Sequence, residues 1–208
     1  GRIAAILSKK ANAVWNTQRL RFSRIDFIDD IDVSSALIQR VEQWAKELGM
    51  KEIHGPIGFS DFDQQGMLVE GFDRQSMFIT IYNHAYYKTH MEQLGYGKDI
   101  DWVEFRITCP TALEPRIEQL SELVLKRNNL KLLTFSSKKE IKPLIPAVFE
   151  IINESYQSLY GVVPLNKRQI DKYVDEFLKL INLDYVCLLQ DQNDKAVGFG
   201  LAIPSLAE

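Results

Sequence analysis

One segment in the first quarter of the chain constrains the fold most strongly. Apolar residues recur there at spacings of four, four, three and four, at Val33, Leu37, Val41, Trp44 and Leu48. This spacing places them on one face of an α-helix. Asp32 is a suitable N-cap, and Gly49 is a suitable residue to follow the last turn. We therefore predict a single helix over residues 33–48 with this apolar face buried.

Composition and charge are those of an ordinary globular protein. The 208 residues are 46% hydrophobic and 25% charged, enough for one large domain or two small ones. The net charge of −3 gives no basic field for nucleic acid. No apolar run approaches the ~20 residues that cross a bilayer, and the chain does not open on a secretory signal pattern. We expect a cytoplasmic protein without a nucleic-acid or membrane partner.

The rest of the chain is predicted to alternate short strands with helices, which indicates an α/β fold. Strands are expected at residues 1–7, 51–59, 78–82, 101–107, 131–135, 185–189 and 196–203. Helices are expected at residues 85–94, 113–124, 141–156 and from Asn166, which resembles a capping box with Gln169. We interpret the remaining early segments as a polar stretch, an acidic segment and a loop, at residues 8–21, 25–32 and 60–71.

Both ends of the sequence read as strands. The chain starts at Gly1 rather than at Met, directly inside an apolar strand, so we expect an excised fragment. Gly198–Ile203 is also similar to Gly1–Ile6, although a match this short can arise by chance. If the match is real, the chain spans one period of a duplicated domain.

A series of short segments resembles a known family. They are Gly1–Ile6, Phe27–Asp30, Glu42–Met50, His54–Phe59, Gly66–Asp73 and Asp101–Glu104, together with Asn83, Tyr86, Tyr87 and Leu94–Tyr96. In this order they resemble bacterial proteins of unassigned substrate that carry two units of the N-acetyltransferase type called GNAT. The resemblance covers residues 1–107 well and residues 131–208 more weakly.

The resemblance implies a GNAT-like fold, a mixed sheet with helices on both faces, present here as two partial units. The C-terminal half of a first unit, a helical linker and the N-terminal half of a second unit would occupy residues 1–107, 108–130 and 131–208. In this fold the fourth and fifth strands splay apart to admit the pantetheine arm of acyl-CoA. The fourth strand, the helix after it and the fifth strand would be residues 1–7, 33–48 and 51–59.

The implied activity is an acyl-CoA-dependent N-acyltransferase that uses acetyl-CoA or another acyl-CoA and an unknown amine acceptor. The family's usual glycine-rich phosphate loop is missing before the helix. Four carboxylates stand there instead, at Asp26, Asp29, Asp30 and Asp32. A carboxylate repels a phosphate 4 Å away by roughly 4 kcal/mol at an effective dielectric constant of ~20. We therefore predict that residues 22–34 bind no phosphate or CoA, unless Arg19, Arg21 and Arg24 point inward.

The candidate catalytic residues are His54, Tyr86 and Tyr87, and the candidate cofactor-binding residues are Ile3, Ala5 and Asn83. His54 can act as the base or be a structural histidine. The two tyrosines can replace the acid that relatives carry at the position of Met91, or pack against the sheet. Asn83 aligns with an Asn that meets the pantetheine arm, or caps the following helix.

No metal site is predicted. His84 and His90 are spaced six apart on a short helix, which is not a chelating spacing. Cys109 and Cys187 are too few and too isolated for a disulfide framework or a zinc site.

Two functions stay open: an N-acyltransferase, or a GNAT-like binding or structural module without catalysis. The missing glycine loop and Met91 favour the second for this chain, whereas the resemblance favours the first for its parent protein. In either case the open edges of the two terminal strands need cover. We expect the two halves to pack together within one chain, or to exchange in a homodimer.

Overall fold

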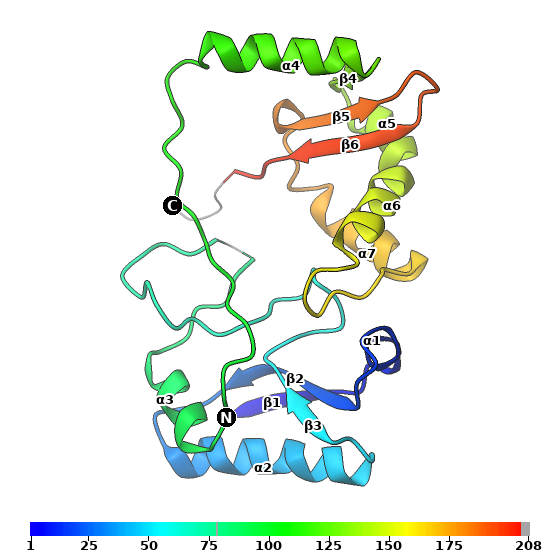
Figure 1. Ribbon diagram of the computed structural model, residues 1–208. Coiled ribbons are helices and arrows are strands. Elements are labelled where there is room, and N and C mark those ends of the chain that lie inside the picture. Colours follow the sequence, from blue (N-terminus) through cyan, green and yellow to red (C-terminus); the bar gives the residue numbers. More distant parts are fainter. Residues whose placement is uncertain (78, 205–208) are drawn as a thin grey trace. The chain divides into compact units, whose positions relative to one another are not determined.

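A computed structural model describes residues 1–77 and 79–204. The fold is mixed α/β and divides into two compact units. The first unit comprises Gly1–Val103 with Leu159–Val163, and the second comprises Glu104–Ser158 with Pro164–Pro204. Each unit holds one three-stranded sheet and its own helices (Figure 1).

The first unit is built around a strand–helix–strand motif. Its elements are β1 (Arg2–Ile6), α1 (Lys9–Val14), β2 (Arg19–Asp26), α2 (Ile31–Glu47), β3 (Glu52–His54) and α3 (Tyr86–Gln93). In the sheet order β1-β2-β3, β1 is antiparallel to β2, and β2 is parallel to β3. Two parallel strands need a long crossover connection, and α2 provides it along one face of the sheet (Figure 1).

The core of this unit lies between β2 and α2. Leu20 and Phe22 of β2 are buried against Val41 and Ala45 of α2. Successive side chains of a strand point to opposite faces, so Arg21 lies on the face away from this core. The sheet thus has one apolar face, covered by α2, and one polar face.

The predicted helix over residues 33–48 is confirmed, but its N-cap and its buried line differ from the prediction. Asp30 is the N-cap, because its Oδ1 accepts hydrogen bonds from the backbone N–H groups of Asp32 at 2.9 Å and of Val33 at 3.4 Å. The fully buried positions are Ser34, Ile38, Val41 and Ala45. The small Ser34 and Ala45 fit along the centre of the face, so Trp44 flanks it half-buried and Leu48, beyond the last turn, is exposed.

The interpretation of residues 8–21 as a polar stretch and of residues 25–32 as an acidic segment is wrong in part, because β2 runs through both. As a consequence, residues 1–7 are not the strand that leads into α2. The expectation from the resemblance is displaced by one strand: β2 precedes the helix, and β1 is its antiparallel neighbour.

Two other strand predictions fail. Residues 79–82 and 101–107 form no strand within the described chain, and Phe78 lies outside the described residues. Val103, Phe105 and Ile107 are 69%, 83% and 80% exposed. Alternating apolar residues satisfy the side-chain pattern of a strand, but its backbone also needs a partner that supplies hydrogen bonds. The strand expected at residues 51–59 ends at His54, two residues before a proline that has no N–H group.

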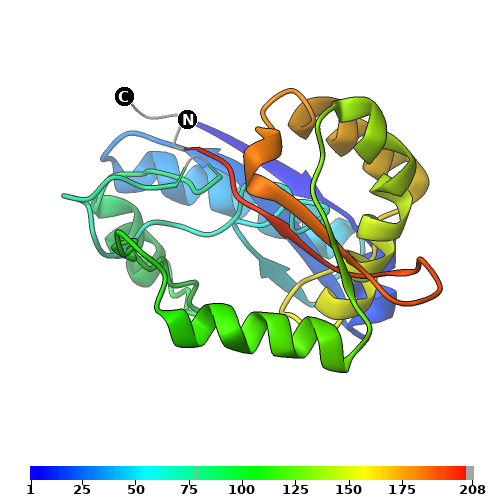
Figure 2. The same ribbon diagram turned by 90° about the horizontal axis from the view of Figure 1, so that it is seen from above.

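The second unit carries the sheet β4-β5-β6, in which neighbouring strands are antiparallel. Its strands are β4 (Lys131–Leu133), β5 (Val186–Gln190) and β6 (Ala196–Leu201). Its helices are α4 (Pro115–Arg127), α5 (Lys138–Ile141), α6 (Ile145–Tyr156) and α7 (Lys167–Phe177), with the 3₁₀ turns η1 (Lys142–Leu144) and η2 (Leu183–Tyr185). The predicted hairpin and the capping box of Asn166 and Gln169 are confirmed, and α6 packs against β6 (Figure 2).

Both terminal strands lie at sheet edges. Within the residues that the structure describes, β1 pairs with β2 alone and β6 pairs with β5 alone. Among the described residues, the expected ladder partners on both sides of these strands are therefore not found, and a homodimer through these edges stays a prediction. In the described ranges, no helix has the length and apolar character needed to cross a membrane.

Candidate functional site

A small cavity opens on the polar face of the first unit's sheet. Its volume is about 50 Å³, enough for a few groups the size of water. It is lined by Ala11, Asn12, Trp15, Thr17, Arg19, Arg21, His54, Tyr160 and Gly161. Tyr160 and Gly161 belong to the short stretch Leu159–Val163 that joins this unit from far along the sequence.

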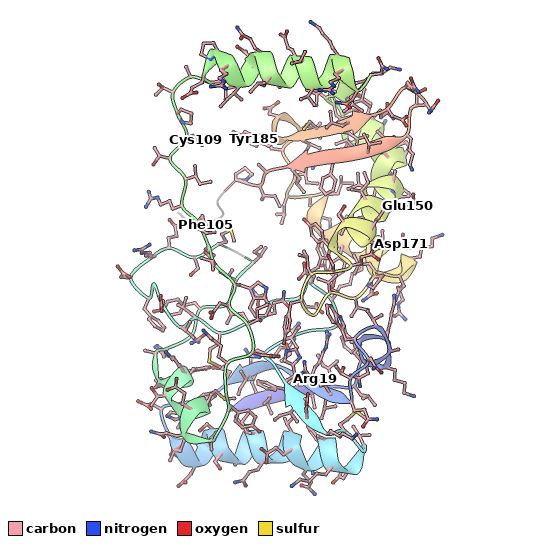
Figure 3. All side chains as sticks on the ribbon, viewed as in Figure 1. Arg19, Phe105, Cys109, Glu150, Asp171 and Tyr185 are labelled. Carbon is pink, nitrogen blue, oxygen red and sulfur yellow. The ribbon has the colours of Figure 1, made fainter. Side chains whose placement is uncertain are left out.

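Two neighbouring strands position the charged residues of the cavity. In the parallel register of β2 and β3, Arg19 is opposite Glu52 and Arg21 is opposite His54. Residues opposite each other in a sheet share a face. Arg19 lies on this part of the sheet (Figure 3), and its Nε is 2.5 Å from Oε2 of Glu52. The register therefore gathers two guanidinium groups and an imidazole on one face.

His54, Tyr160 and Asp99 form a hydrogen-bonded chain at the cavity. The hydroxyl oxygen of Tyr160 lies 2.7 Å from Nε2 of His54. The same hydroxyl donates its proton to Oδ2 of Asp99. A tyrosine has one proton to donate, so Nε2 of His54 must be the donor to Tyr160. This leaves Nδ1 of His54 as an acceptor, and none of the described residues makes a hydrogen bond to it.

The electrostatic environment of the cavity keeps His54 and Tyr160 in one protonation state. Burial lowers the pKa of His54, and the positive charge of Arg19 lowers it further, so the imidazole is neutral at neutral pH. Burial and the hydrogen bond to Asp99 raise the pKa of Tyr160 to about 12. Tyr160 thus keeps its proton and orients His54, which is free to accept a proton on Nδ1.

Arg21 is the most buried charged group of the cavity, with 5% of its surface exposed. Its Nη1 donates to the carbonyl of Gly58 at 2.8 Å, and its Nη2 donates to the carbonyl of Gly161 at 3.1 Å. Burial lowers the pKa of Arg21. The side chain therefore ties the segment after β3 to the stretch at residues 159–163.

Tyr86 and Tyr87 lie at the loop between β2 and α2 and do not line the cavity. The Tyr86 hydroxyl donates to the carbonyl of Phe27 at 2.7 Å. The Tyr87 hydroxyl donates to Oδ1 of Asp26 at 3.0 Å and accepts from the backbone N–H of Phe27 at 3.1 Å. Phe27 also stacks on Tyr87, with ring centroids 4.1 Å apart. These contacts agree with the alternative in which the two tyrosines have a packing role rather than act as the acid.

The three candidate cofactor-binding residues also lie outside the cavity lining. The buried Asn83 side chain accepts from the N–H of Leu68 at 2.7 Å and donates to the carbonyl of Leu68 at 3.0 Å. Ile3 and Ala5 are partly buried against the core between β2 and α2. Of the six candidates, the structure thus brings His54 alone into the cavity, among the residues it describes.

The start of α2 does not fit the pyrophosphate of CoA. The N–H groups of Asp32 and Val33, which would bind a phosphate, already donate to the side chain of Asp30. Arg19 and Arg21 line the cavity, and Arg24 is exposed on β2. No step involving a phosphate group is therefore assigned to this helix terminus.

The fold and the cavity define a mixed α/β protein with a partly buried histidine–tyrosine pair. No family model matches the chain, and no solved structure matches it. It is similar to Protein YghO of Escherichia coli (strain K12), with 26% identity over 209 aligned positions that cover 100% of this chain and 53% of that protein. It is also similar to the bacterial ceramide synthase of Caulobacter vibrioides, with 22% identity over 193 positions, 90% of this chain and 48% of that protein. The chain thus spans about half the length of these curated relatives.

Proposed function

We propose that the protein to which this chain belongs is a GNAT-like N-acyltransferase, which transfers an acyl group from a thioester such as acyl-CoA to an amine. Two lines of similarity support the proposal. Residues 1–107 resemble N-acetyltransferases, and one relative is named a ceramide synthase. A ceramide is the amide of a fatty acid and a long-chain amine, so both similarities point to amide formation. A long-chain amine is accordingly the first acceptor to test.

The topology of the first unit supports a GNAT-like fold. β2, α2 and β3 form the strand–helix–strand order that this fold has around its fourth and fifth strands, with β2 in the place of the fourth. α3 then follows as the next helix. In this correspondence the fourth strand of the GNAT-like fold is β2, whereas the sequence resemblance placed it at residues 1–7.

The observation that carries the proposal is the free Nδ1 of a neutral His54. When an amine attacks a thioester, the new C–N bond forms, the C–S bond breaks, and the amine proton must leave. His54 can accept that proton and then return it to the departing sulfur, so that amide and thiol are the products. Tyr160 and Asp99 fix the imidazole so that Nδ1 is the accepting atom.

The experiment compares two histidine variants of the parent protein. His54→Gln keeps a donor near Tyr160 but removes the basic nitrogen. His84→Gln changes an exposed histidine outside the cavity lining and serves as the matched control. With acyl-CoA and a long-chain amine, mass spectrometry should show N-acylated product from wild type. We expect H54Q to reduce kcat/KM about 100-fold or more and H84Q to change it less than about twofold. Full activity of H54Q would contradict the role of His54.

A second function, a GNAT-like module without catalysis, is favoured by the residues around α2. Asp30 occupies the N–H groups of the helix start, and Tyr86, Tyr87 and Asn83 all bond within the protein. A cavity of about 50 Å³ is also too small for a whole acyl-CoA molecule. A thermal shift separates the two functions, because a bound acyl-CoA raises the melting temperature by mass action and a module without the donor site shows no rise.

A further inference from the structure

We propose that the cavity beside His54 binds a small oxyanion, the phosphate or carboxylate group of a ligand, on the guanidinium group of Arg21. The inference rests on the surroundings of Arg21 and does not require acyl transfer. It concerns the polar face of the sheet, whereas the phosphate site implied by the GNAT resemblance would lie at the start of α2.

The two arginines of the cavity differ in their counter-charges. Arg19 is paired, with Glu52 at 2.5 Å and Asp99 at 3.6 Å. Arg21 has no carboxylate within 4 Å among the described residues, although it is far more buried than Arg19. A buried charge without a partner is costly, and proteins normally compensate it with an opposite charge or a ligand.

The hydrogen bonds of Arg21 leave room for such a ligand. A guanidinium group has five N–H donors in a planar fork. One N–H of Nη1 and one of Nη2 donate to the carbonyls of Gly58 and Gly161. These carbonyls hold the plane of the group but bring no negative charge. The remaining donors suit an oxyanion, which guanidinium groups bind through paired N–H contacts.

The other walls of the cavity limit what the ligand can be. The Asn12 side chain accepts from the N–H and donates to the carbonyl of Arg19, and it also accepts from the Thr17 hydroxyl. The indole N–H of Trp15 donates to the carbonyl of Val162. Glu52 and Asp99 are engaged by Arg19, so they do not neutralise Arg21. The space of about 50 Å³ has the size of a single phosphate or carboxylate group.

The test uses Trp15, whose indole N–H reports directly on the cavity in nitrogen-15 NMR spectra. The wild-type chain is titrated with sodium phosphate and with sodium acetate, against sodium chloride at the same ionic strength. We expect phosphate, acetate or both to shift the Trp15 indole resonance in a saturable way and to raise the melting temperature, while chloride does neither. Saturation by phosphate assigns a phosphate group, and saturation by acetate assigns a carboxylate. Equal effects of all three salts would overturn the proposal.

Variants then assign the binding to Arg21. We expect Arg21→Gln to weaken binding at least tenfold and Arg24→Gln, an exposed arginine of the same strand, to leave it within twofold. Because R21Q removes contacts to two loops and can unfold the chain, Arg21→Lys keeps the charge and should bind several-fold more weakly than wild type. Wild-type affinity in R21Q or R21K would refute the site. H54Q retains Arg21, so anion binding by H54Q without acyl transfer separates this proposal from the proposed function.

Discussion

The hydroxyl of Ser34 lies 2.9 Å from Nδ1 of His90, and Nε2 of His90 lies 3.0 Å from Oδ1 of Asp29. The three residues have the composition of a catalytic triad, but Ser34 is completely buried and its hydroxyl also lies 3.0 Å from the carbonyl of Ile31. A nucleophile without access to solvent cannot meet a substrate. The set instead links α2, α3 and the loop before α2.

The first prediction concerns His90. His90→Ala removes a buried ring and leaves the Ser34 hydroxyl short of a partner, so the free energy of unfolding should fall by about 2–4 kcal/mol. Urea denaturation measures the change. Asp29→Asn is the control: the Asp29 side chain is 68% exposed, so the loss should stay below about 1 kcal/mol. Equal losses in both variants would show that the hydrogen bond between His90 and Asp29, rather than the buried link to Ser34, carries the stability.

The second prediction is a pH dependence of stability. Because burial lowers the pKa of His54 in the folded chain, the unfolded chain binds more protons just below the ordinary histidine pKa of about 6.5. Stability that is present above this value should therefore be lost as the pH falls through it towards the lower folded pKa. Urea midpoints measured between pH 5 and pH 8 test this. The difference between wild type and H54Q isolates the histidine, and a difference that does not vary with pH would contradict the prediction.

The third prediction distinguishes two neighbouring aspartates. Asp30→Ala removes the acceptor for two N–H groups of the first turn of α2 and should cost about 1 kcal/mol. Asp32→Ala removes only a favourable charge near the helix start and should cost roughly 0.5 kcal/mol. Chemical denaturation of both variants side by side is sufficient. A larger loss of stability in D32A than in D30A would indicate that Asp32, as the sequence predicted, is the N-cap.

The fourth prediction concerns Gly161, whose φ of +73° is unfavourable for other residues. A Cβ atom there would also lie 2.9 Å from Cδ1 of Ile57. Gly161→Ala should therefore cost about 2 kcal/mol or more and displace the carbonyl that Arg21 contacts. Gly49→Ala is the matched control, because its φ is +70° but no described atom lies within 4 Å of the added Cβ. It should cost about 1 kcal/mol, and thermal denaturation would reveal whether the two differ.

Sequence periodicity predicted the helices better than the strands. α2, α3 and α7 each satisfy their hydrogen bonds within one segment, so capping residues and apolar spacing are sufficient signals. β2 was missed although its residues 19–23 alternate between polar and apolar side chains. Arginine in a sequence usually predicts a solvent-exposed position. In β2, however, Arg19 and Arg21 line the cavity.

The cavity was harder to predict than the fold. His54 was selected from the sequence, but its partner Tyr160 lies 106 residues away, and no local pattern connects them. Arg21 was considered only as a residue that offsets the acidic loop. The alternation of residues 19–23, paired in register with β3, would have placed Arg21 beside His54, whereas Tyr160 and Asp99 required the structure.

The return of residues 159–163 to the first unit has a consequence for synthesis of the chain. Arg21 and Gly161 are 140 positions apart, and Trp15 and Val162 are 147 apart. While the ribosome is still translating the segment up to α6, β1, β2, β3 and α2 can already assemble, but the cavity lacks one wall. Contacts at such separation form late, because a long loop must close first. The nascent chain therefore exposes the charge of Arg21 to solvent until Val163 has left the ribosome, and a ribosome-stalled chain that ends before Tyr160 should display an open, hydrated form of the site.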